Sequence, residues 1–276
     1  MKKIKIIKAN GDQDYFSEEK FLNSIIKSGI SQEIAKGILK EIEGELKEGT
    51  TTGEIYKKAF SRLKKEHRPA AARYSLKQAL MELGPTGYPF EQIVGRILER
   101  EGYKVSFPES VQGRCIRHEV DVVAEKGKEK IMAEVKFHNQ AGFRTDAKTA
   151  MYVRGRFEDL SFVKENGFNR GWLVTNTKFS KDAIDYANCV GITAIGWDHP
   201  RERGIEEMLI ESKLLPITVL TTLNREEKRK LLEAEIVVCS DLKIKEREVK
   251  MIIGEKKFIS ALKETEEIEN KNNSAA

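Results

Sequence analysis

The pattern of hydrophobic positions in residues 1–86 predicts a short β-hairpin followed by four helices. Apolar residues alternate along residues 4–8, and the turn-forming pair Asn10-Gly11 follows them. Four segments with apolar residues every three or four positions come next. Each begins at a residue that commonly caps or opens a helix, and these residues are Ser17, Ser31, Thr51 and Pro69. Gly84-Pro85 ends the fourth segment, so residues 1–86 form the first predicted domain.

Residues 88–200 mix helical and strand-like patterns, which predicts an α/β sandwich. Residues 90–101 carry apolar side chains at helical spacing. Two apolar runs, residues 119–124 and 131–137, are separated by a turn around Gly127 and therefore predict a β-hairpin. The remaining predicted elements are strands at residues 103–107, 171–176 and 192–195 and a helix at residues 180–189.

Residues 205–270 are predicted to be mainly helical, so the whole chain is predicted to be a multidomain α/β protein. The apolar positions of residues 214–242 faintly resemble a helix-hairpin-helix unit, a module that grips the DNA backbone. Ala234-Glu235 stands where such a unit is expected to have glycine. A plain packing or dimerisation element is the favoured alternative, and dimerisation would make the protein a homo-oligomer.

Three ionisable residues lie inside the two apolar runs: Asp121, Glu134 and Lys136. Such charges are costly to desolvate unless they are paired or bind a metal. Because side chains alternate along a strand, Glu134 and Lys136 share one face, and a hairpin would bring Asp121 to the same edge. Two carboxylates at one point suit Mg²⁺, and a neighbouring lysine can orient a water or neutralise a phosphate. The set predicts phosphodiester hydrolysis, and a salt-bridged edge strand is the alternative.

Composition and charge narrow the class of protein without identifying it. The chain has 276 residues, a net charge of +5 and 34% charged residues, so binding of nucleic acid must rely on local basic patches. Its three cysteines are far apart in the sequence, which disfavours a zinc site and a disulfide framework. The N-terminus lacks the apolar core of a signal peptide, and no apolar run approaches the ~20 residues that span a bilayer. We therefore expect a cytoplasmic protein with no membrane partner.

The order of motifs in the central part resembles the Mrr-like branch of the PD-(D/E)xK restriction-endonuclease superfamily. The resemblance covers residues 88–198 and rests on the helix with Glu91, on Asp121, on Glu134-Val135-Lys136, and on residues 174–183 and 191–192. It implies an αβββαβ nuclease core. It also implies that Asp121 and Glu134 bind Mg²⁺ or Mn²⁺, that Lys136 is the catalytic lysine, and that Glu91 completes the site. The chain departs from the family in two ways. Many Mrr-like members have Gln at the position of Glu134, and many have a Gly-rich stretch before the first acid, which in this chain is reduced to residues 112–114.

Several polar and basic residues that flank the motif are further candidates. His118 is a candidate contact for the scissile phosphate, although a structural role is favoured for a single histidine at a strand start. His138, Asn139 and Gln140 follow the motif strand and are candidates for the wall of a groove. A basic stretch is interpreted either as a DNA-phosphate contact or as a solvated helix face, and it comprises Arg144, Lys148, Arg154 and Arg156.

Residues 4–82 contain no P-loop, but they resemble the ATP-cone, the nucleotide-sensing module of ribonucleotide reductases and their repressor. The resemblance implies that Lys8 and Lys20 hold phosphates of ATP or dATP, that Thr52 touches the nucleotide, and that Asp14 makes an acidic contact. Two lysines beside a helix N-terminus do form an anion site. Ala9 departs from the many cones that have a second basic residue there, which leaves the preferred nucleotide open. In the alternative interpretation, the lysines are ordinary surface residues and the threonines are helix caps.

The leading hypothesis from the sequence is a Mg²⁺-dependent DNA endonuclease that is regulated by a nucleotide. Without hydrolysis machinery, the nucleotide can only shift an equilibrium between states that bind it differently. The glycine- and proline-rich segment 84–89 is where we expect this shift to reach the nuclease. The rival hypothesis is a DNA-binding regulator that responds to ATP or dATP on a catalytically inactive nuclease scaffold. DNA is the expected partner under both hypotheses.

Overall fold

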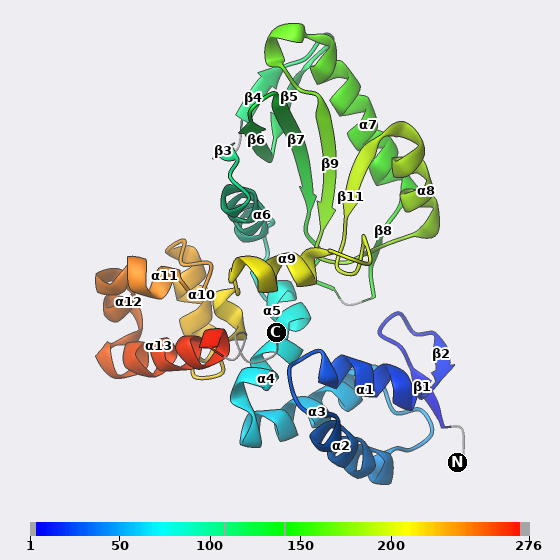
Figure 1. Cartoon of the computed structure of the whole chain (residues 1–276), viewed down its shortest axis with the longest axis vertical. Helices are drawn as coiled ribbons and strands as arrows, with labels where there is room; N and C mark the ends of the chain where they lie inside the picture. The colour runs from blue at the N-terminus through cyan, green and yellow to red at the C-terminus, as the bar shows by residue number, and fades with distance from the viewer. Residues whose placement is uncertain (1–3, 108, 141, 271–276) are drawn as a thin grey trace.

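The chain folds as a mixed α/β protein around one five-stranded sheet, with helices from both ends of the chain gathered below it (Figure 1). The structure is a computed structural model, and it describes residues 4–107, 109–140 and 142–270. The sheet shares one hydrophobic core with the C-terminal helices, and α13 also contacts α4.

The N-terminal segment contains the predicted hairpin, β1 (Lys5–Ile7) and β2 (Gln13–Tyr15), and then α1 (Glu18–Ile26), α2 (Gln32–Glu45) and α3 (Thr52–Glu66). The antiparallel strands turn at Gly11, whose φ of 87° suits glycine. Ser17, Ser31 and Thr51 each accept a hydrogen bond from a backbone N–H in the first turn of the helix that follows. The three predicted caps are therefore confirmed, because capping depends on local sequence.

The fourth predicted helix, residues 69–83, is instead two helices, α4 (Arg68–Tyr74) and α5 (Leu76–Met81). The break lies at Ser75, whose hydroxyl donates to the Ala72 carbonyl at 2.9 Å, and such a side-chain bond competes with the helical ladder. The side chains of Leu76, Leu80 and Leu83 are buried in the same hydrophobic core as the C-terminal helices. The chain around residue 80 therefore packs with the C-terminal segment.

The central sheet has the strand order β11-β9-β7-β6-β3. Its strands are β3 (Lys104–Ser106), β6 (Val122–Lys126), β7 (Glu129–Lys136), β9 (Arg170–Thr175) and β11 (Ile192–Ile195). Helix α6 (Tyr88–Arg100) covers one face, and α7 (Ala147–Phe162) and α8 (Lys181–Val190) cover the other, as Figure 1 shows. The elements α6, β3, β6, β7, α7 and β9 follow one another in the αβββαβ order that the sequence implied, so the mixed α/β core is confirmed.

The first apolar run is not one strand. Residues 117–120 form β5 (Arg117–Val120), which pairs with β4 (Glu109–Gln112), whereas β6 pairs within the central sheet. Asp121 lies at the break between them. The pattern also failed to locate α7, β4 and the small parallel pair β8 (Arg144–Thr145) and β10 (Lys178–Phe179). Helix α7 does not separate apolar from polar residues clearly, because it buries Arg156 and exposes Tyr152 and Phe162. The pattern of apolar positions therefore gave no helix signal there.

The C-terminal segment is helical, as predicted. It contains α9 (Ile205–Ser212), α10 (Arg225–Glu233), α11 (Asp241–Ile244), α12 (Glu246–Ile253) and α13 (Glu255–Asn270), and the short 3₁₀ turns are η1 (Lys164–Asn166) and η2 (Ile217–Val219). Helix α13 packs against α4 of the N-terminal segment. The turn after α10 places Glu235 at φ 55°, and the Lys245 ammonium donates to the carbonyls of Ala234 and Glu235 at 3.2 Å. The choice between a packing element and a DNA-binding hairpin stays a prediction.

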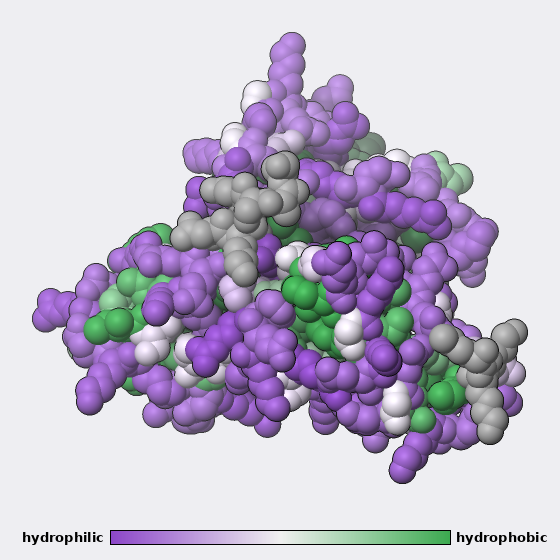
Figure 2. Space-filling model, turned by 60° about the horizontal axis from the view of Figure 1, so that its bottom comes forward, coloured by the Kyte–Doolittle hydropathy of each residue, from purple (hydrophilic) through white to green (hydrophobic). Residues whose placement is uncertain are grey.

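The surface is mainly hydrophilic. Figure 2 shows hydrophobic side chains reaching the surface only in small separate areas of the face in view, one of them over the C-terminal helices. The most exposed apolar side chains of those helices are Ile244, Met251 and Ile259. None of the helices in the described ranges is both long enough and apolar enough to cross a membrane.

Candidate active site

Asp121 is held at the strand break by a backbone contact to the neighbouring strand. One oxygen of its carboxylate, Oδ2, accepts a hydrogen bond from the Val135 N–H of β7 at 2.7 Å. Burial, together with the charge of the nearby Glu134 carboxylate, raises the pKa of Asp121 to about 6. The break between β5 and β6 therefore aims this carboxylate at the end of β7, where the next two candidates lie.

Glu134 lies within β7 on the face that α7 covers, and it is only 2% exposed. One oxygen of its carboxylate is paired with the Lys136 ammonium and the other with the Arg156 guanidinium from α7. Arg156 also donates to the carbonyl of Glu119. From the sequence, Arg156 was predicted only as part of a basic stretch, so its place in the site is a new finding of the structure.

Lys136 is the last residue of β7, and its side chain is 37% exposed at the edge of the sheet. It therefore connects the buried Glu134 to solvent. The structure brings Asp121, Glu134 and Lys136 together, as the strand geometry predicted, while their chemical roles remain predictions. The alternative, a purely structural salt bridge, would account for the Glu134–Lys136 pair but not for a third ionisable side chain, Asp121, directed at the same point.

Glu91 joins this group from the first turn of α6. Its pKa is raised to about 7, first by burial and then by the carboxylates of Asp121, Glu134 and Glu119. One of its carboxylate oxygens is so close to Gly87 that a Cβ atom on Gly87 would lie 3.2 Å from it. The site therefore carries more negative than positive charge, and protons or cations bind there favourably.

Replacing Glu91 by Gln should remove part of the pH dependence of stability in the absence of metal. The folded chain holds the Glu91 proton up to about pH 7, whereas the ordinary pKa is 4.5. Protonated Glu91 therefore adds to the stability of the folded chain at low pH. This added stability is lost as the pH rises from 4.5 to about 7. At pH 8, Glu91→Gln should be more stable than the wild type by on the order of 1–2 kcal/mol, after discounting for solvent screening, and at pH 5 the difference should be much smaller.

Urea denaturation in EDTA at pH 5 and pH 8 measures this difference. Glu99→Gln is the matched control, because Glu99 is exposed on the same helix. Equal pH dependence of the wild type and Glu91→Gln would show that Glu91 does not share the charge of the site.

The donor chemistry of this group suits a divalent cation with hard oxygen preference. Asp121 and Glu134 supply two carboxylates, and Mg²⁺ is commonly bound by one or two carboxylates and completes its shell with waters and substrate phosphates. Across the part of the chain that the structure describes, no three His, Cys, Asp or Glu side chains form a ready cage for a metal ion. The residues therefore fit a metal that is shared with a substrate better than a permanently enclosed one.

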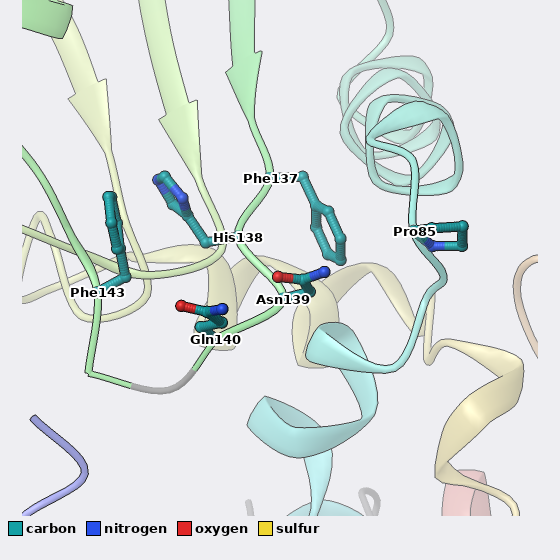
Figure 3. A pocket seen from close by; sticks show the side chains of 6 residues that line it. All are labelled: Pro85, Phe137, His138, Asn139, Gln140 and Phe143. Atoms are coloured by element: carbon teal, nitrogen blue, oxygen red, sulfur yellow. The ribbon is translucent and has the colours of Figure 1, made fainter.

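A pocket of about 260 Å³ opens next to the end of β7. Figure 3 shows Phe137 and Pro85 on one side of it and His138 and Phe143 on the other, with Asn139 and Gln140 between them. The three polar residues that were predicted to line a groove therefore do so.

The buried Val174-Thr175-Asn176 segment at the end of β9 fixes the start of this loop. The side chain of Asn176 accepts from the His138 N–H at 2.9 Å and donates to the His138 carbonyl at 2.8 Å. The Thr145 hydroxyl is linked to the His138 ring and to Thr175, each at 3.2 Å. The polar residues of this segment thus hold the loop that lines the pocket.

The other flanking candidates separate into different roles. His118 is bound to Asp159 of α7 at 2.8 Å and is 8% exposed, so the favoured structural role is supported for it. Arg154 is paired with Glu158 and donates to the Val190 carbonyl. Arg144 and Lys148 are exposed. The basic stretch is therefore not one surface, and its two exposed members remain candidates for contacts with phosphate.

The residues predicted to bind a nucleotide lie together in the N-terminal segment. The Lys8 ammonium is 2.7 Å from the Asp14 carboxylate, and the positive charge of Lys20 contributes to lowering the pKa of Asp14. A β-bridge between Ile7 and Thr51 places the end of β1 beside the first turn of α3, which begins at Thr52. Their role in binding is not tested by this arrangement, because Lys8 and Asp14 also satisfy each other.

Comparison with known proteins identifies two segments. Residues 84–198 match the restriction endonuclease family Mrr_cat, and residues 215–269 match the family "AF1548-like, C-terminal". An uncharacterized protein of Archaeoglobus fulgidus is 43% identical over 149 residues, which are 54% of this chain and 83% of that protein. The crystal structure of AF1548, a protein of unknown function, is 38% identical with a TM-score of 0.56, and the match covers 67% of this chain and 99% of that one. Both family matches begin after residue 83.

Proposed function

Because the chain belongs to the family of AF1548-like proteins and carries a restriction-endonuclease domain, we propose that it is a metal-dependent DNA endonuclease. One observation carries the proposal. Asp121, Glu134 and Lys136 converge at the edge of the sheet in the segment that matches the restriction endonuclease family. A protein that had lost cleavage would have no chemical reason to keep this costly group of charges in partly buried positions.

In the proposed reaction, Asp121 and Glu134 would hold Mg²⁺ or Mn²⁺, and Glu91 of α6 would be a further acid beside them. When bound, the cation supplies positive charge that activates a water and stabilises the charge developing on the phosphate. Lys136 reaches solvent from the same edge, so its ammonium can contact the scissile phosphate or orient the attacking water. The raised pKa of Glu91, about 7, also suits it to accept a proton near neutral pH.

DNA is the proposed partner, and two features near the site support it. The pocket beside Lys136 offers the polar side chains of Asn139 and Gln140. The exposed Arg144 and Lys148 lie on β8 and at the start of α7, and can neutralise backbone phosphates.

Incubation of the purified chain with supercoiled plasmid tests the proposal. Nicked or linear products should form with Mg²⁺ or Mn²⁺ and should not form in EDTA, with ATP and dATP added in separate reactions. The rival hypothesis of a non-enzymatic regulator predicts that DNA is retarded in a gel without being cut. Retardation without products under every metal and nucleotide condition would reject the endonuclease in favour of that rival.

We further propose that ATP or dATP binds at Lys8, Asp14, Lys20 and Thr52 and regulates the nuclease, as the resemblance to the ATP-cone implied. The support is a direct contact between this segment and the loop that lines the pocket. Gly142 lies so close to the turn after β1 that a Cβ atom on it would be 3.0 Å from the Asn10 nitrogen and 3.2 Å from the Ala9 carbonyl carbon. In Figure 1 the β1–β2 hairpin lies just below the end of the sheet near β8. A nucleotide that moves the turn would therefore also move the pocket loop.

Replacing Gly142 by Ala should weaken this coupling. The new methyl group meets the backbone of the turn, and the substitution is also strained because Gly142 has φ 86°. Gly127→Ala is the matched control, because Gly127 has φ 62° but nothing within 4 Å of a built Cβ. The factor by which ATP or dATP changes DNA affinity, typically about 5- to 150-fold in allosteric proteins, should fall towards one in Gly142→Ala and be unchanged in Gly127→Ala.

Isothermal titration with ATP and with dATP, with and without DNA and in EDTA to prevent cleavage, measures this factor. Because coupling is reciprocal, DNA must change nucleotide affinity by the same factor in the wild type. If ATP or dATP changes the DNA affinity of Gly142→Ala by the same factor as that of the wild type, the coupling does not pass through Gly142. Segment 84–89 is then the next candidate.

A further inference from the structure

Arg156 reaches the site from the helix that covers the sheet. It is 8% exposed, and its two terminal nitrogens bind the Glu134 carboxylate and the Glu119 carbonyl. Its Nε is buried and lacks a hydrogen-bond partner within the described residues. A guanidinium that is buried with one donor unsatisfied is held there mainly by the negative charge of Glu134.

Glu134 needs this partner when no metal is present. Its side chain is almost fully buried, and a buried carboxylate that loses its counter-charge costs several kcal/mol. Lys136 serves one of its oxygens and Arg156 serves the other. Both oxygens are therefore engaged by cations of the protein itself.

A divalent cation on Asp121 and Glu134 would need electron pairs of the same carboxylate. It would also be repelled by the guanidinium, because like charges a few ångströms apart interact strongly in a partly buried site. Lys136 is more exposed and can turn towards solvent, whereas Arg156 is enclosed by the sheet and α7. The competition therefore involves Arg156 more than Lys136.

We propose that Arg156 is the resident counter-ion of Glu134, which positions this carboxylate in the metal-free protein and limits how tightly the site binds a divalent cation. This inference rests on the proposed metal site at Asp121 and Glu134. Arg156 acts through Glu134 and is a positioning residue. Its presence keeps the acidic group folded before DNA and metal arrive.

Binding of Mn²⁺ alone to the full chain, without DNA, tests the inference by isothermal titration and by thermal melting. Arg156→Gln should bind Mn²⁺ at least about tenfold more tightly than the wild type, because the competing charge is removed. Its melting temperature should be lower than that of the wild type in EDTA and should rise more on addition of Mn²⁺. Arg154→Gln is the matched control on the same helix, because Arg154 pairs with Glu158 outside the site, and it should bind Mn²⁺ like the wild type.

Arg156→Lys keeps the charge, and it should fold and bind Mn²⁺ within about threefold of the wild type, which guards against misfolding of Arg156→Gln as the explanation. Folding of Arg156→Gln only in Mn²⁺ would also support the inference. Equal or weaker binding by Arg156→Gln, while the wild type binds, would overturn the inference and leave the nuclease proposal standing. Absence of Mn²⁺ binding to the wild type and to every variant would overturn the inference, while the plasmid assay decides the nuclease proposal separately.

Discussion

Asp121→Asn should lower the rate of metal-dependent DNA cleavage by at least about 10³-fold, because the substitution removes a charged ligand from a site that needs it for chemistry. The amide oxygen of Asn can still accept the hydrogen bond that the Val135 N–H donates to Asp121. The fold should therefore survive. In EDTA at pH 7 the variant should be at least as stable as the wild type, because the raised pKa of Asp121, about 6, means that its ionised form is unfavourable there.

Single-turnover cleavage of a duplex in Mg²⁺ measures this rate, and a gel-shift measurement in EDTA checks that DNA binding is retained. Asp182→Asn, an exposed acid in the first turn of α8, is the matched control and should cleave at the wild-type rate. Cleavage by Asp121→Asn within tenfold of the wild type would remove Asp121 from the reaction.

Asp241→Ala should destabilise the protein by about 3–5 kcal/mol, which is the usual result of breaking one side of a buried ion pair. Asp241 is 3% exposed and joins the C-terminal helices to α6 of the restriction-endonuclease-like domain. Its carboxylate accepts from the backbone N–H groups of Val237 and Val238 at 2.9 and 3.1 Å, and it is 2.6 Å from the Arg96 guanidinium of α6. Alanine would leave all three donors without their partner.

Urea denaturation followed by the fluorescence of Trp172 and Trp197 measures this loss. Glu246→Ala is the control, because Glu246 makes an exposed pair with Lys250 on α12 and should cost less than about 1 kcal/mol. A loss below about 1 kcal/mol for Asp241→Ala would mean that the C-terminal helices are not anchored to α6 through this residue.

Features that depend on neighbouring residues could be predicted from the sequence. The turn at Gly11, the caps at Ser17, Ser31 and Thr51, and the β6–β7 hairpin each follow from local preferences. The convergence of Asp121, Glu134 and Lys136 was predictable because side chains alternate along paired strands. The roles of these residues, the nucleotide site and the domain boundaries remain predictions that the fold does not test.

Features that depend on distant partners were missed. The break at Asp121 arises because β5 pairs with β4 while β6 pairs with β7, and no local pattern encodes that change of partner. The contact of Gly142 with the Asn10 turn was likewise invisible, so segment 84–89 was the only route that the sequence offered between the two domains.

Arg156 is the one missed site residue that the sequence could have indicated. Ala150, Val153 and Leu160 are the buried apolar residues of α7, and residue 156 is three positions after Val153 and four before Leu160. Helical spacing therefore puts Arg156 on the buried face, where an arginine requires an acidic partner. Grouping it with the exposed Arg144 and Lys148 by charge alone concealed this periodicity.

The central claim is that this acid–acid–lysine group cleaves DNA. The most direct test is the rate at which supercoiled plasmid is converted to nicked product in Mg²⁺ by the wild type and by Lys136→Met, which keeps the aliphatic stem and removes the charge. We predict conversion by the wild type that EDTA stops, and conversion at least about 10²-fold slower by Lys136→Met. Equal rates for the two proteins, or no conversion by the wild type with any divalent metal, would contradict the claim.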